Sequence, residues 1–129
     1  MAKGIIIREA HFPGKAPIEA YGNGGFRFAD MSHRGSLLVL PSGIHGWEPA
    51  DPQALTAADF TRLLAEAGKV ELVLVGTGKD LRALPAALRA VLKEAGIAAD
   101  PMSTGAAVRT YNVLLAEDRA VAAALIAVD

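Results

Sequence analysis

The sequence predicts an α/β fold: a three-layer single domain with a mostly parallel central sheet, helices and an additional N-terminal β-layer. From residue 55 onward, helix-like and strand-like segments alternate, which is typical of a sheet built from βα units. Residues 1–50 instead hold most of the glycine and aromatic residues and no amphipathic helix, which indicates a separate set of short strands. No linker-like stretch interrupts the 129 residues, so we expect one domain spanning 1–129.

The first half is expected to form a β-hairpin and two further short strands. Ile18–Tyr21 and Phe26–Phe28 flank Gly22-Asn23-Gly24-Gly25, whose glycines can supply the positive φ angles of a tight turn. Leu37–Leu40 is a short apolar run that a proline ends, and Ile44–Trp47 resumes before another proline.

The second half begins with a helix and a buried strand. Thr56 is a good N-cap, Asp59 occupies the third helical position, and Gly68 ends the helix. The continuous apolar run Leu72–Val75 is typical of a strand covered on both faces.

The remaining segments continue the same alternation. We expect a helix over Pro85–Ala95, which Gly96 ends, a short strand over Ile97–Met102 and a helix over Thr104–Ala116. Ala122–Val128 fits helix or strand by pattern alone, but the preceding alternation favours a closing parallel strand.

A candidate ligand site lies at one edge of the predicted sheet. A Gly-Thr-Gly segment closes one strand and a Ser-Thr pair opens the helix after the next strand, so the two should meet where ligands usually bind. Backbone N–H groups beside a helix start can hold an anion. The candidate ligand-binding residues are Gly76, Thr77, Gly78, Ser103, Thr104, Arg109 and Asn112.

Each of these residues also has a structural interpretation. The glycines fit a tight strand-to-helix turn, Ser103 an N-cap, Arg109 a solvated surface position, and Asn112 a side chain that bonds neighbouring backbone. The Walker pattern is not met, because it needs four residues between its first glycine and Gly-Lys-Ser/Thr. The dinucleotide fingerprint is not met either, because Leu81 stands where it needs its third glycine.

Composition excludes several function classes. A net charge of −1 gives no drive toward nucleic acid, and no apolar run approaches the ~18 residues of a membrane span. The absence of cysteine excludes disulfides and thiolate catalysis. No signal or transit pattern is recognised at the start, so we expect a cytoplasmic protein or one peripheral to the inner membrane.

Catalytic and metal sites are not indicated either. The three histidines are widely spaced, and no nucleophile elbow supports a triad of Ser103, His45 and Asp100. We therefore predict no catalytic residue, no metal and no cofactor. Trp47 is expected in the core or, alternatively, as an anchor for a partner.

Several short motifs share an order and spacing with one known family: Leu40-Pro41, Trp47, Gly76-Thr77-Gly78, Gly96-Ile97, Thr104-x-x-Ala107-x-x-Thr110-Tyr111-Asn112-x-Leu114, Arg119 and Ala123-Ala124-Leu125-Ile126. The chain thereby resembles, as a bacterial-type member, the small uncharacterised α/β family that includes mitochondrial respiratory complex I assembly factor 3. The resemblance implies the same three-layer fold and no established enzymatic activity. It also implies a protein partner, because the mitochondrial relatives act as assembly factors with a second assembly protein.

Two functions follow as hypotheses. The first is a non-catalytic accessory or assembly protein that binds another protein, at a membrane complex or its assembly machinery. The alternative is an enzyme or sensor that binds a small anionic metabolite in the cleft near Gly76–Gly78.

Overall fold

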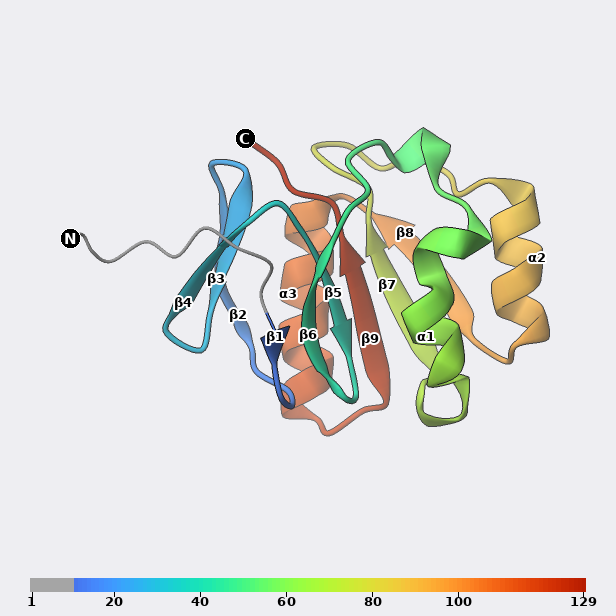
Figure 1. Cartoon of the computed structure of the whole chain (residues 1–129), viewed down its shortest axis with the longest axis horizontal. Coiled ribbons are helices and arrows are strands. Elements are labelled where there is room, and N and C mark those ends of the chain that lie inside the picture. Colours follow the sequence, from blue (N-terminus) through green and yellow to red (C-terminus); the bar gives the residue numbers. More distant parts are fainter. Residues whose placement is uncertain (1–10) are drawn as a thin grey trace.

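A computed structural model describes residues 11–129 (Figure 1). Within these residues the strands form two sheets. The larger sheet has six strands in the spatial order β1 (His11–Phe12), β6 (Gly43–Trp47), β5 (Ser36–Leu40), β9 (Val121–Leu125), β7 (Leu72–Gly76) and β8 (Ala98–Met102). The smaller sheet has three, in the order β2 (Ile18–Gly22), β3 (Gly25–Phe28) and β4 (Met31–Arg34).

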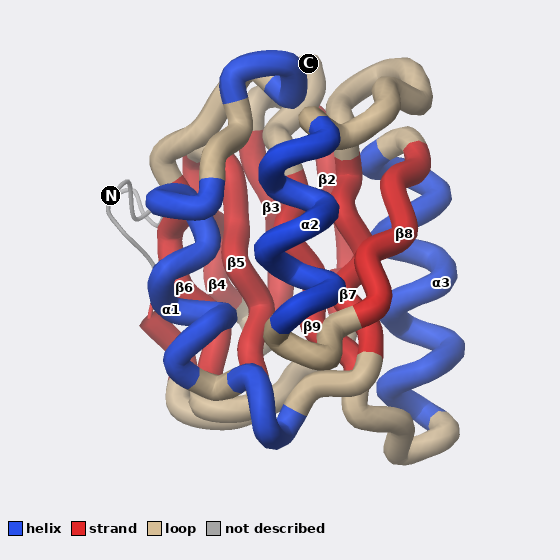
Figure 2. Tube along the Cα trace, turned by 90° about the vertical axis from the view of Figure 1, so that its right-hand side faces the viewer, coloured by secondary structure: helices blue, strands red, loops and turns tan. Residues whose placement is uncertain are grey.

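The layers lie on either side of the six-stranded sheet. The helices α1 (Thr61–Ala65) and α2 (Ala86–Glu94) cover one face, as Figure 2 shows. The helix α3 (Thr104–Ala116) and the small sheet cover the other face (Figure 1). Each face has its own apolar cluster, and the α/β class with an additional N-terminal β-layer is confirmed.

The strand β9 lies at the centre of this arrangement. All five of its residues are buried, and its side chains alternate between the two clusters. Ala122 and Ala124 pack toward α1 and α2, whereas Ala123 packs toward α3. Small side chains on both faces let the covering layers approach the sheet closely.

The hairpin of the first half forms where it was expected. Asn23 and Gly24 have φ of 51° and 79°, which is the backbone of the two-residue turn that Asn-Gly favours between antiparallel strands. The next turn is similar but has no glycine, because Ala29 and Asp30 adopt φ of 47° and 62°. Because no glycine marks this turn, β4 was not predicted. The two-residue strand β1 was not predicted either.

The helices of the second half agree with the sequence predictions to different degrees. The expected helix from Thr56 to Gly68 is divided: the short α1 lies between 3-10 turns at Ala57–Phe60 and Ala67–Lys69, and another such turn spans Pro52–Ala54. The backbone N–H of Thr56 donates to the Asp59 carboxylate at 2.9 Å, so the expected N-terminal cap is present. The predictions for α2, α3 and the closing strand β9 are confirmed to within a few residues.

The expected mostly parallel sheet is instead a mixed sheet. β7 pairs in parallel with both β8 and β9, as the alternation indicated. On the other edge of β9, however, β5 pairs antiparallel, and β6 and β1 extend the sheet with further antiparallel pairings. Strands from the first half therefore pair along the edge of β9 that β7 leaves open. Among the described strands, the separate layer consists of β2, β3 and β4.

Candidate functional site

The structure brings the Gly-Thr-Gly segment and the start of α3 together. The backbone N–H of Thr104 donates to the Gly78 carbonyl at 2.8 Å, and the Gly78 N–H donates to the Thr104 hydroxyl at 3.0 Å. A Cβ on Gly76 would lie only 3.0 Å from the Cα of Thr104. Glycine at this position therefore permits the close approach of β7 to the helix.

The Thr104 hydroxyl joins three segments of the chain. It is fully buried, accepts from Gly78 and donates to the Ile126 carbonyl at 2.7 Å. It thus holds the end of β9 against the loop that follows β7.

Thr77 organises that loop. Its hydroxyl donates to the Asp80 carbonyl at 2.7 Å and accepts from the Arg82 N–H at 3.0 Å. Its own N–H donates to the Met102 carbonyl at 2.8 Å. The amides of Thr77, Gly78 and Thr104 are thus all engaged within the protein, and an anion at this edge would need other donors.

Ser103 caps α3, because its Oγ accepts from the Ala106 N–H at 3.3 Å. Among residues 11–129, Lys79 and Arg82 are the cations that line this edge. They line an open cavity of about 430 Å³ together with Asp51 and Asp80, so both signs of charge are present. Its full lining comprises Ala50, Asp51, Pro52, Gln53, Thr77, Gly78, Lys79, Asp80, Arg82, Ile126, Ala127, Val128 and Asp129.

Arg109 and Asn112 lie away from the end of α3 that meets Gly78. Asn112 is eight residues beyond Thr104, which is about 12 Å along a helix. Its carboxamide accepts from the Ile18 N–H at 2.8 Å and donates to the Ile18 carbonyl at 2.9 Å. Asn112 therefore bonds both backbone groups of Ile18, as a residue of a neighbouring strand would. The Arg109 side chain is exposed.

Tyr111 fixes the same N-terminal segment. Its hydroxyl donates to the Ala16 carbonyl at 3.0 Å, and the side chain is 1% exposed. Burial raises the pKa of Tyr111 to about 12. Together Tyr111 and Asn112 attach the start of the small sheet to α3.

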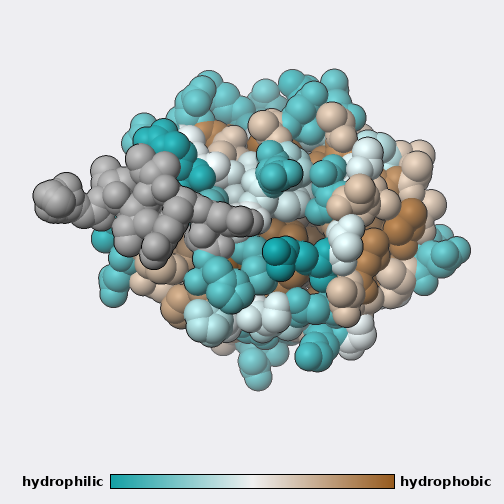
Figure 3. All heavy atoms as spheres, viewed as in Figure 1, coloured by the Kyte–Doolittle hydropathy of each residue, from teal (hydrophilic) through white to brown (hydrophobic). Residues whose placement is uncertain are grey.

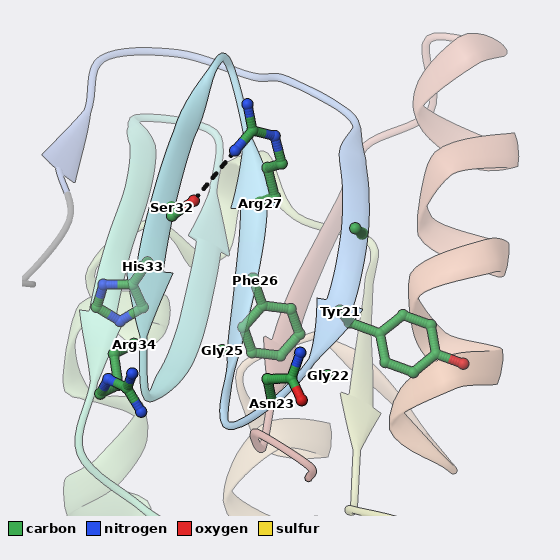
Figure 4. Close-up of a pocket in the computed structure, with 10 residues that line it drawn as sticks. Tyr21, Gly22, Asn23, Gly25, Phe26, Arg27, Ser32, His33 and Arg34 are labelled. Atoms are coloured by element: carbon green, nitrogen blue, oxygen red, sulfur yellow. Dashed lines mark hydrogen bonds between the residues drawn. The ribbon is translucent and has the colours of Figure 1, made fainter. Parts of the chain in front are cut away.

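A cavity that no sequence motif indicated lies on the small sheet (Figure 4). It measures about 300 Å³ and is lined by Ala20, Tyr21, Gly22, Asn23, Gly25, Phe26, Arg27, Ser32, His33 and Arg34. Three of these ten residues, Ser32, His33 and Arg34, come from β4, a strand that the sequence pattern did not reveal. Of the residues that the structure describes, two arginines and no carboxylate line this cavity.

Trp47 belongs to the core. Only 9% of it is exposed, its indole N–H donates to the Asp59 carbonyl at 2.8 Å, and its ring packs edge-on against Phe60. A third cavity of about 490 Å³ lies beside it and includes Glu48, Asp59 and Arg62.

Two of the histidines meet across paired strands. The Nδ1 atoms of His11 and His45 lie 3.2 Å apart. Among residues 11–129, no three His, Asp or Glu side chains form a group that could hold a metal ion.

The face of the molecule that Figure 3 shows is largely polar. In Figure 3 the apolar surface gathers at the side where Figure 1 places α2. Val91 on α2 is 37% exposed, and Leu81 in the preceding loop is 61% exposed. Across residues 11–129, no helix has the length and apolar character to cross a membrane.

The profile of a family of proteins of unknown function, DUF498/DUF598, matches residues 18–126. The chain belongs to this family. An uncharacterized protein of Rhodobacter capsulatus is 44% identical over 92% of this chain and 90% of its own length. The resemblance inferred from the motifs is confirmed, because mouse NADH dehydrogenase [ubiquinone] 1 alpha subcomplex assembly factor 3 is also similar. It is 29% identical over 95% of this chain and 66% of its own length.

The fold is shared with a solved structure. The crystal structure of a protein from Bartonella henselae, described as an outer membrane protein, superposes with a TM-score of 0.89. It is 61% identical and covers 92% of this chain and all of its own.

Proposed function

We propose that this chain is a non-catalytic accessory protein that binds another protein, as an assembly factor does. One observation carries the proposal: the polar groups at the predicted ligand edge are used to hold the fold. The hydroxyls of Thr77 and Thr104 and the amide of Gly78 all bond to other parts of the chain. Similarity to assembly factor 3 supports a protein partner.

The alternative is an enzyme or sensor that binds a small anionic metabolite near Gly76–Gly78. The cavity beside Gly78 favours it, since Lys79 and Arg82 line that cavity. Asp51 and Asp80 line it too, and their charges oppose an anion. The accessory function is therefore the better supported of the two.

The proposed partner is a membrane complex or its assembly machinery, and the proposed location is the cytoplasm or the periphery of the inner membrane. The similarity to a complex I assembly factor supports that partner. The outer membrane description of the Bartonella protein gives the competing location, which fractionation of cells would decide.

A pair of experiments tests the function. The tagged chain is isolated from cells that naturally make it, and co-purifying proteins are identified by mass spectrometry and confirmed by reciprocal capture. In parallel, its thermal stability is measured with phosphate, sulfate and small carboxylates, using Lys79→Gln with Arg82→Gln as the matched variant. A stoichiometric partner with no anion response supports the accessory function; a saturable anion response that this double variant abolishes, with no partner, overturns it.

A further inference from the structure

One face of the small sheet carries its cations. Strand register places Ala20, Arg27 and Ser32 opposite one another, and likewise Gly25 and Arg34. Residues directly opposite in paired strands share a face of the sheet. This surface, which we name the arginine face, consists of Ala20, Gly22, Gly25, Arg27, Ser32 and Arg34.

The arginine face is hollow because its centre lacks long side chains. Gly22 and Gly25 pair with each other, and Ala20 is the next small residue along β2. A Cβ on Gly25 would collide with the backbone carbonyl oxygen of His33, so this position is restricted to glycine. The result is the cavity of about 300 Å³ that Figure 4 shows, with Arg27 and Arg34 toward its two ends.

The charge of this cavity differs from that of the other two. Among residues 11–129, no Asp or Glu lines it, although the cavities beside Gly78 and Trp47 each contain carboxylates. Arg27 Nη1 donates to the Ser32 hydroxyl at 3.2 Å, and its Nε lies 3.7 Å from the Glu19 carboxylate. Arg34 is exposed, and within residues 11–129 no carboxylate lies within 4.0 Å of its guanidinium.

The spacing of the two arginines suits an extended chain. Arg27 and Arg34 are diagonal neighbours across β3 and β4, so their Cβ atoms lie somewhat closer than about 7–8 Å. Alternate residues of an extended peptide lie on one side of it at intervals of roughly 6.6 Å. An extended segment that crosses the cavity can place one acidic residue at each guanidinium, and such pairs form charge-assisted hydrogen bonds.

We propose that the arginine face docks an acidic, extended segment of the partner protein. This inference rests on the proposed accessory function and names the chemistry of the partner that it would recognise. The hydroxyl of Ser32 and the carboxamide of Asn23 supply further polar contacts at the same cavity.

The test uses a fluorescein-labelled peptide in which Glu and Val alternate, and a second peptide with Gln in place of Glu. Fluorescence anisotropy is measured at low ionic strength, because exposed charges are screened by salt. We expect the Glu peptide to bind and the Gln peptide to bind far more weakly. Arg34→Gln and Arg27→Gln should each weaken binding about fivefold, and Arg34→Glu should weaken it further.

Two controls accompany these variants. Arg89→Gln removes an exposed cation from α2 and should leave peptide affinity unchanged. Thermal unfolding should show that the arginine variants retain wild-type stability. Equal binding by wild type and Arg34→Glu overturns the inference, and so does displacement of the peptide by inorganic phosphate at similar concentration, which would show a site for small anions.

The proposed function and this inference fail separately. If native capture yields a partner that binds Arg34→Glu as well as wild type, the accessory function stands, but the proposal that the arginine face docks this partner fails. If capture yields no partner, the accessory function fails whatever the peptide does.

Discussion

Replacing Thr104 by valine should destabilise the fold, although the two side chains have nearly the same volume. The Thr104 hydroxyl is fully buried, accepts from the Gly78 N–H and donates to the Ile126 carbonyl. Valine leaves both backbone groups without that partner, and each buried unsatisfied group costs about 1–3 kcal/mol. We expect the free energy of unfolding to fall by about 3 kcal/mol.

The assay is urea and thermal unfolding followed by circular dichroism. For a chain of 129 residues, a loss of that size lowers Tm by ~10 °C. Thr104→Ser is the matched control, because it keeps the hydroxyl and removes only a methyl group, at a cost of about 1 kcal/mol. The reasoning is refuted if Thr104→Val is as stable as the wild type or if Thr104→Ser is equally damaging.

Three further predictions concern the glycine loop and the attachment of the small sheet. Gly78→Val should lower the free energy of unfolding by about 1–3 kcal/mol, because Gly78 has φ of +103°, which valine rarely adopts. No atom lies within 4 Å of a Cβ at this position, so the backbone conformation alone accounts for the loss. An unchanged Tm would contradict this prediction. Asn112→Ala should cost about 1–2 kcal/mol and accelerate amide exchange at Ile18, which loses its side-chain acceptor; unaltered exchange would count against that account. The pKa of Tyr111 is about 12, above ~10 in the unfolded chain, so its contribution to stability is complete below about pH 10 and is lost as pH rises toward 12. Thermal unfolding should therefore show a smaller alkaline loss in Tyr111→Phe than in the wild type, and equal losses would be inconsistent with that burial effect.

The elements that the sequence predicted well depend on local patterns. The helix α3 begins at Thr104 and ends at Ala116 as expected, because an N-cap precedes a sustained apolar face. The apolar run around β7 and the alternation of elements were enough to place β8, β7 and β9 in one parallel group.

The elements that it missed depend on distant pairing or on unusual turns. A continuous apolar run such as Leu37–Leu40 fits either the main sheet or a separate layer, and only its pairing with β9 decides between them. The β3–β4 turn places Ala29 and Asp30 at positive φ. Aspartate is common in such turns, but alanine is not, so the pair gave no turn signal.

The sequence predicted which segments meet at the candidate site, but not which hydrogen bonds their polar groups make. Local motifs correctly indicated that Gly78 and Thr104 would meet at one edge of the sheet. They could not show that the amide of Thr77 already bonds to Met102 or that the Thr104 hydroxyl bonds to Ile126, because those partners come from other strands. Whether the seven predicted residues bind a ligand stays a prediction.

The hydrogen bonds of α3 connect the two sheets, and this has a consequence for the arginine face. Near its start, Thr104 holds the ends of β7 and β9; further along, Tyr111 and Asn112 hold the segment that leads into β2. A docking surface binds well only if its residues are held in place before the partner arrives. Asn112→Ala should therefore weaken binding of the acidic peptide although it removes no arginine, whereas the exposed Arg89→Gln should not. Full peptide affinity in Asn112→Ala would mean that the small sheet keeps its shape without its attachment to α3.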